Sequence, residues 1–254
     1  MYINMGNYKK LKNPPIKECV IGIGIKNYFN HDLKEEPIYN EIQKIYPKIS
    51  ETTKNDIKIK GKDIETQAVS NGYRFSSESN KEHIFIEKNR VAFADTNKYE
   101  NFDIFFSKFD RLLNIVRKYL PIESIEQIAL KYVNHIILDQ DEVVDKQKIK
   151  FLPNFAVLNK DKLFAKLIGF GGNYILQSEK YTNIKALVNS SLQFIGENPK
   201  LQVVFNIDTI ADVTKEKISS NNSDKIAEYI LKLKDFKNEI FFSNVDNDIK
   251  EFNK

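Results

Sequence analysis

The alternation of apolar and polar residues divides the chain into strand-like and helix-like segments. Residues 16–25 are mostly apolar, include two glycines and follow a pair of prolines, which predicts a strand beginning near residue 16. Asn71-Gly72 is a pair that favours a tight hairpin turn. Further strand-like runs lie at residues 57–60, 64–69, 73–76, 83–87 and 90–94. Together these patterns predict an antiparallel meander.

Three segments have the helical period. Residues 101–120 place apolar side chains, four of them phenylalanines, three or four positions apart and so predict a long helix packed on a sheet. Residues 223–242 show the same spacing, and Ser223 is suited to cap the start of that helix. A shorter helix is predicted at residues 35–46, where Pro47 ends it.

The second half of the chain repeats the order of the first, with strands followed by a long helix. Gly171-Gly172 predicts a hairpin turn within it. We therefore predict an α+β fold with two antiparallel β-sheets, each packed by a long α-helix. Residues 1–145 and 146–254 would form the two lobes of a pseudo-repeat within one compact unit. The later strand patterns lie at residues 128–138, 162–169, 173–178, 184–195 and 201–207.

The segment at residues 129–138 is the most informative for function, because polar side chains interrupt a run that predicts a buried strand. Lys131, Asn134 and His135 stand among apolar neighbours, and Tyr132 lies in the same run. A buried polar group without a partner costs roughly 1–3 kcal/mol. Either a network inside the protein or a bound ligand must therefore satisfy these side chains.

Two further residues are candidates for a binding site. Asp208 follows the apolar run 201–207, where an acid can bind a cation, act as a base or cap the next turn. Arg74 stands between two aromatic residues, where it can hold a phosphate or a carboxylate in a bidentate pair. A cross-strand pair at the surface is the alternative role for Arg74.

Composition and charge narrow the function classes. The 254 residues are 41% hydrophobic and 29% charged, which is typical of a soluble globular protein. No apolar run is long enough to cross a bilayer, and the first residues do not resemble a secretory signal, so we expect a cytoplasmic protein. A net charge of +4 does not by itself indicate nucleic-acid binding, which stays open.

The sequence contains no recognisable catalytic or metal-binding constellation. Its three histidines are spaced too widely for a metal motif, and its single cysteine, Cys19, rules out both an internal disulfide and a cysteine cluster. No Gly-x-Ser-x-Gly elbow occurs. We therefore expect no catalytic residue, metal or cofactor, and we leave open whether the protein is an enzyme.

Six short motifs occur in order along the chain. They are Pro14-Pro15-Ile16-Lys17-Glu18, Gly72 to Ser76, Tyr99 to Phe105, Lys131 to Ile136, Ile207-Asp208 and Phe241 to Asp246. Over nearly its whole length the chain thereby resembles a sporadically distributed family of uncharacterised bacterial proteins of about this size. Lys131 and His135 stand where the family pattern has arginines, and Phe102 stands where it has tryptophan. If those arginines grip an anion, the grip is altered here, because lysine and histidine lack the bidentate fork.

The leading functional hypothesis is a non-enzymatic binding or adaptor protein that recognises a protein or peptide. Sheets with free edges suit the addition of a partner's strand. The scattered distribution of the family implies mobile or phage-defence gene cassettes, with a partner encoded by an adjacent gene and a chaperone-like or antitoxin-like role. The alternatives are a small-ligand or nucleotide-sensing or processing domain and a nucleic-acid-binding protein, and self-association stays open.

Overall fold

The structure, a computed structural model, describes most of the chain. Its contacts divide into two compact units. The α2 unit comprises Cys19–Ala129 and Asp212–Glu228, and the α4 unit comprises Met1–Glu18, Leu130–Ala211 and Tyr229–Lys254. The described residues are 11–25, 34, 36–60, 63–96, 99–120, 122–139, 150, 169–195, 200–246, 249 and 252.

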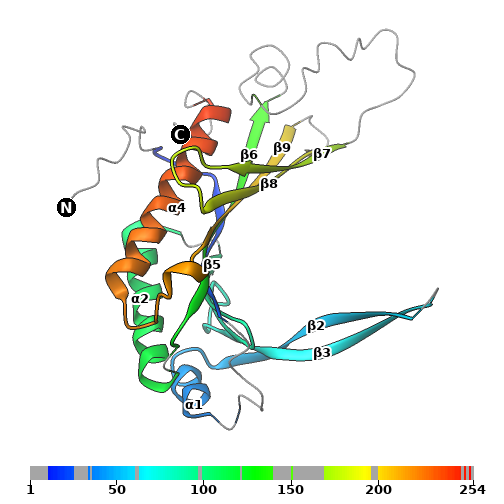
Figure 1. Ribbon diagram of the computed structural model, residues 1–254. Coiled ribbons are helices and arrows are strands. Elements are labelled where there is room, and N and C mark those ends of the chain that lie inside the picture. Colours follow the sequence, from blue (N-terminus) through cyan, green and yellow to red (C-terminus); the bar gives the residue numbers. More distant parts are fainter. Residues whose placement is uncertain are drawn as a thin grey trace. The chain divides into compact units, whose positions relative to one another are not determined.

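The described part of the α2 unit contains an antiparallel meander, the helices α1 and α2, the short helix η3 and the first residues of α4. Strands β2 to β5 pair in chain order, and β2 and β3 run side by side as a long two-stranded ribbon (Figure 1). Asn101 caps α2, because its Oδ1 accepts a hydrogen bond from the backbone N–H of Ile104 at 2.9 Å. The elements are β1 (Ile16–Ile25, from Cys19 on), α1 (Pro37–Gln43), β2 (Lys48–Lys60), β3 (Asp63–Ser76), β4 (Glu82–Glu87), β5 (Arg90–Thr96), α2 (Phe102–Tyr119) and η3 (Thr214–Glu216).

The α4 unit contains a second meander and most of the last helix. Strand β8 pairs antiparallel with both β7 and β9. The start of α4 belongs to the α2 unit, and its cap there is Asn222, whose Oδ1 accepts from the N–H of Lys225, so the assignment of Ser223 as the cap is wrong. The elements are β6 (Ile125–Asp139, from Leu130 on), β7 (Gly169–Gln177), β8 (Ile184–Ile195), β9 (Lys200–Asp212) and α4 (Ser223–Asn244, from Tyr229 on).

The strands of the described residues belong to one nine-stranded sheet, so the prediction of two separate sheets is wrong, whereas the α+β class is confirmed. The strand order is β2-β3-β4-β5-β1-β6-β9-β8-β7. Strands β1 and β6 are neighbours within this order. On its other side β1 is next to β5 of the first meander, and β6 is next to β9 of the second. A hydrophobic pattern specifies a strand but not its neighbour, and for that reason the join between β1 and β6 was missed. The lobe boundary expected at residue 145 lies outside the described residues and stays a prediction.

Gly72 lies inside a strand and does not form the predicted hairpin turn. Strand β3 runs through Asn71-Gly72, and Gly72 is paired with Thr52 on one side and Glu87 on the other. The register between β2 and β3 shifts at Thr52/Thr53, beside this glycine. Its φ of +149° is one that side chains rarely adopt, and a Cβ here would lie 2.2 Å from the carbonyl oxygen of Ile86. The glycine is therefore required for an irregular strand and a close backbone approach.

Two predictions in the α4 unit also need correction. Gly171-Gly172 lies within β7, paired with β8, so it does not form a turn. Strand β9 continues beyond residue 207 to Asp212, which places Asp208 in the middle of a strand instead of at its end. In both places pairing with β8 overrides the local turn signal. The strand expected from residue 162 lies outside the described residues up to residue 168.

Aromatic side chains occupy the core of each unit. In the α2 unit, the ring centroids of Phe93 in β5 and Phe105 in α2 are 5.5 Å apart. In the α4 unit, the ring of Phe205 in β9 stacks on that of Phe241 in α4 at 6.2 Å. All four rings are buried, so within each unit a long helix covers one face of the strands, as the helical periodicity predicted.

Candidate functional site

The α4 unit has one sheet face covered by α4 and one open face. Even-numbered residues of β6 from Leu130 to Leu138 are buried, and so are odd-numbered residues of β9 from Val203 to Ala211. Successive side chains on a strand point to opposite faces. The remaining residues of these strands, which include Lys131, His135 and Asp208, therefore lie together on the open face.

Tyr132 and Asn134 lie on the covered face. Asn134 is 3% exposed, and its Nδ2 donates a hydrogen bond to the carbonyl oxygen of Phe205 at 2.9 Å. Tyr132 is buried, and the Nζ of Lys237 in α4 lies 4.1 Å from its ring centroid. These two side chains therefore have partners within the protein and do not share a face with Lys131, His135 and Asp208.

Lys131 has a charged partner on a neighbouring strand, and the strand register places Asp208 beside β8. The Nζ of Lys131 lies 3.5 Å from a carboxylate oxygen of Glu18 in β1. Asp208 is paired in register with Leu187 of β8. Asp212, four residues on, is the residue that caps the next turn, because its Oδ1 accepts from the N–H of Thr214 at 3.1 Å. The open face thus brings together three of the six predicted candidate residues.

His135 is held as a neutral base on the open face. The side-chain nitrogen of Gln202 lies 2.9 Å from His135 Nδ1, and because an amide nitrogen donates, Nδ1 accepts. Partial burial and the nearby charge of Lys17 lower the pKa of His135 below its usual value. In this tautomer Nε2 carries the ring hydrogen, so the imidazole can donate a hydrogen bond to a ligand.

The lowered pKa of His135 predicts a pH-dependent stability. Below about pH 6.5 the unfolded chain binds a proton more readily than the folded protein, so stability is retained above that pH and falls as the pH falls. In urea unfolding from pH 7.5 to 5.5, the wild type should lose more stability than His135→Gln. Parallel loss in both proteins would contradict the assignment.

A row of amide side chains crosses the open face beside these residues. Asn173, Asn189 and Asn206 are in register across β7, β8 and β9. Asn189 Nδ2 donates to Asn173 Oδ1. Such a face offers hydrogen bonds to a polar ligand, and a small-ligand role for Lys131, His135 and Asp208 stays a prediction.

Arg74 belongs to the α2 unit and does not share the open face of the α4 unit. It is exposed on β3, where its Nε donates to the Oγ of Ser50 in β2 at 3.2 Å. Arg74 and Ser50 are also partners in the strand register. The structure thus places Arg74 in a cross-strand pair, the alternative considered for it from the sequence.

Strand β7 provides a surface that the sequence analysis missed. It is the last strand in the sheet order, and its exposed side chains include Ile175 at 77%, Tyr174 at 40% and Leu176 at 38%. Residues 167–178 contain no charged residue, although 29% of the chain is charged. The absence of charge in this segment is visible in the sequence and could have indicated a binding surface. The edge position of the strand is not visible there, because it is a property of the folded sheet. An exposed apolar edge strand is a template for pairing with another chain.

The opposite end of the sheet, β2, has a different composition. Lysine and acidic residues recur along Lys48–Lys60, and Lys48 and Lys54 are exposed. Charged residues, lysine above all, discourage an edge strand from pairing with other chains. Of the two end strands in the described sheet, β7 is therefore the one suited to strand addition.

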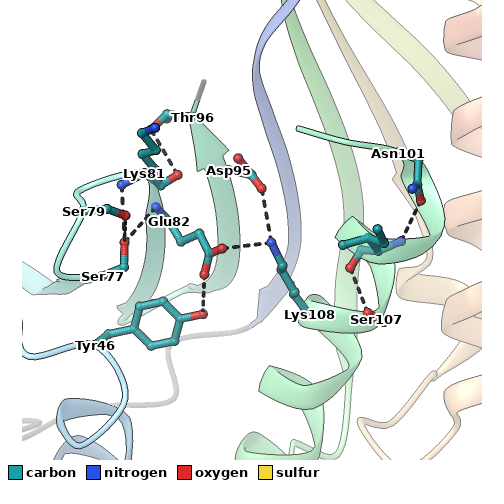
Figure 2. A network of polar contacts seen from close by, with 11 residues as sticks. Tyr46, Ser77, Ser79, Lys81, Glu82, Asp95, Thr96, Asn101, Ser107 and Lys108 are labelled. Carbon is teal, nitrogen blue, oxygen red and sulfur yellow. Dashed lines mark hydrogen bonds and ion pairs between the residues drawn. The ribbon is translucent and has the colours of Figure 1, made fainter. Parts of the chain in front are cut away.

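A polar cluster in the α2 unit was also missed from the sequence (Figure 2). Lys108 of α2 points at two strands: its Nζ lies 2.8 Å from Glu82 Oε1 and 3.5 Å from Asp95 Oδ2. The hydroxyl of Tyr46 donates to the other oxygen of Glu82 at 3.2 Å. Glu82 and Asp95 are partners in the β4–β5 register, so one ammonium group lies between two neighbouring acids.

The pKa shifts of Tyr46 and Lys108 both favour the protonated side chain. Burial, followed by the charge of Glu82, raises the pKa of Tyr46, which therefore remains a hydrogen-bond donor. Burial alone would lower the pKa of Lys108, but Glu82 and Asp95 outweigh that effect and raise it. The arrangement ties α2 to β4 and β5 and gives four buried or half-buried polar side chains, Tyr46, Glu82, Asp95 and Lys108, partners within the protein.

The described residues contain neither a clustered set of metal ligands nor a membrane-spanning helix. No three His, Cys, Asp or Glu side chains in that part of the chain are placed to hold a metal ion. None of the helices described there is both long and apolar enough to cross a bilayer.

Two comparisons with known proteins give no match. No protein-family model matches the chain, and no curated protein matches its sequence. The resemblance to the sporadically distributed bacterial family therefore stays a prediction based on six short motifs.

Proposed function

We propose that the protein is a non-enzymatic cytosolic binding protein that recognises a protein or peptide partner by adding the partner's strand to β7. The observation that carries the proposal is the exposed, uncharged segment Tyr174-Ile175-Leu176 on the last strand of the sheet. In strand addition, main-chain hydrogen bonds supply affinity and alternate side chains supply specificity.

The register of β7 defines the chemistry of a suitable partner. On the open face Ile175 lies opposite Leu187, which is itself 46% exposed, so an added strand meets an apolar row there. On the other face, Tyr174 lies opposite Val188 and Leu176 opposite Ala186. A suitable segment is extended, lacks proline and charge at its centre, and carries apolar side chains on both faces.

We also propose a biological setting for this surface. A partner encoded by an adjacent gene in a mobile or phage-defence cassette fits a surface that captures an exposed strand. A chaperone-like or antitoxin-like protein needs such a surface, because it must cover a segment of its partner. The small-ligand alternative would use Lys131, His135 and Asp208, and nucleic-acid binding is a third alternative.

A lysine at the centre of β7 is expected to abolish partner binding. The probe is a library of displayed nonapeptides, from which binders to the full chain are selected and measured by fluorescence polarisation. Ile175→Lys should weaken binding roughly tenfold or more, about 1.4 kcal/mol, because it places a charge in the apolar row. Ile45→Lys is the matched control, since Ile45 is 58% exposed in the α2 unit.

Backbone methylation of the selected peptides tests the mode of binding. An added strand uses every second N–H for pairing with the edge. Methylating one alternate set of peptide nitrogens should abolish binding, and methylating the other set should leave it unchanged. Equal effects of both sets, or equal binding to wild type and Ile175→Lys, would refute strand addition at β7.

A further inference from the structure

The exposed part of β7 is complementary to itself. An antiparallel pairing of two β7 strands about a twofold axis at Ile175 would place Ile175 opposite Ile175 of the second copy. Tyr174 would then lie opposite Leu176 of that copy. Directly opposed side chains are about 4.5–5.5 Å apart between Cβ atoms, close enough for apolar contact. No charged residue occurs in Gly169–Gln177, so the pairing brings no like charges together.

The register with β8 extends this complementarity across the joined sheet. On one face, Leu187 and Ile175 of one copy would be followed in a row by Ile175 and Leu187 of the second copy. Both side chains are exposed in the single chain. The other face would carry Val188, Tyr174, Leu176 and Ala186. Each exposed apolar side chain of the strand thus gains an apolar neighbour on its own face.

A twofold pairing of this kind is unfavourable for β2, the strand at the other end of the sheet order. A twofold pairing of β2 about its middle at Lys54 would place two lysines in opposition, and like charges directly opposite destabilise a strand pair. The contrast between the two ends therefore favours β7.

We propose that, when no partner is bound, β7 pairs with β7 of a second copy to form a twofold dimer. This inference rests on the proposed function, because both use the edge of β7. It adds that self-association regulates partner binding at that edge. A partner strand displaces the second copy, so partner binding and self-association compete. Two identical patches are what an isologous interface requires.

Sedimentation velocity of the full chain over a range of concentrations tests the dimer. The wild type and Ile45→Lys should show a dimer fraction that rises with concentration. Ile175→Lys and Ile175→Glu should each weaken dimerisation roughly tenfold or more, because each places like charges opposite one another. An equimolar mixture of these two variants should restore the dimer, since a lysine then faces a glutamate. Circular dichroism shows whether each variant is folded.

A cysteine cross-link tests the position of the twofold axis. Ile175→Cys should form a disulfide-linked dimer on mild oxidation, because opposed Cβ atoms near 4.5 Å lie at the upper limit for a disulfide. Ile45→Cys should not, and the native Cys19 is buried. If Ile175→Lys fails to fold, Tyr174→Lys and this cross-link decide the question.

Failure of the dimer and failure of the proposed function give different results. A monomer at every concentration that still binds selected peptides through Ile175 would overturn the dimer alone. A dimer unaffected by changes at Ile175 would also overturn it, because another surface would then be responsible. An Ile175-dependent dimer that no peptide displaces would leave the dimer standing and overturn strand addition by a partner.

Discussion

Replacing Gly72 with alanine is expected to destabilise the protein on the order of 4 kcal/mol, the largest effect anticipated for a single methyl group. A Cβ at this position would lie 2.2 Å from the carbonyl oxygen of Ile86 and 2.6 Å from the Cα of Glu87. These contacts are with backbone atoms, so β4 itself would have to move. A φ of +149° adds backbone strain for any residue other than glycine.

Gly171→Ala is the matched control for this prediction. Gly171 also lies within a paired strand, but a Cβ there would have only one neighbour, the carbonyl oxygen of Ser190 at the ordinary distance of 3.6 Å. Its effect on urea unfolding should therefore be much smaller. Similar losses for the two variants would contradict the close approach of β3 and β4 at Gly72.

Lys108→Met is expected to cost about 2–4 kcal/mol of folding free energy. The ammonium group is the positive partner of both Glu82 and Asp95, and Asp95 has a side-chain exposure of only 2%. Without the lysine, two neighbouring carboxylates would face each other in a poorly hydrated place. Urea unfolding of the variant and the wild type measures the loss.

Lys225→Met provides the comparison for an exposed lysine. Its Nζ lies 3.6 Å from Glu216 and 3.3 Å from Glu228, but about a third of the side chain is exposed. Ion pairs of this kind contribute little, so a change within about 0.5 kcal/mol is expected. Equal losses at Lys108 and Lys225 would show that the cluster in Figure 2 behaves as an ordinary surface pair.

Self-association at β7 would give the proposed function a dependence on concentration. At low concentration the edge would be available to a partner, and at high concentration a second copy would occupy it. An edge of this kind is normally protected by charge, proline or a covering segment. Among the residues that the structure describes, the side chains of Tyr174 and Ile175 remain exposed, which fits protection by a partner or a second copy.

The sequence by itself determined the elements whose signal is local. The apolar stripe at residues 101–120 predicted α2 to within about a residue, and the strand at residues 16–25 is β1. The strand at residues 184–195 is β8. In these segments the periodicity of burial is the same as the periodicity of the sequence, so no distant contact was needed to recognise them.

Only the tertiary structure decided how the strands pair and which side chains share a face. Asn71-Gly72 and Gly171-Gly172 have the composition of turns, yet pairing with neighbouring strands keeps both extended. The polar residues of the run 129–138 were recognisable from the sequence, but their separation, with Asn134 under α4 and Lys131 on the open face, follows from the faces of β6. Strand β7 is at the edge only because all the other strands of the sheet order lie on one side of it. Such properties arise from contacts between residues far apart in the chain, which a local pattern does not encode.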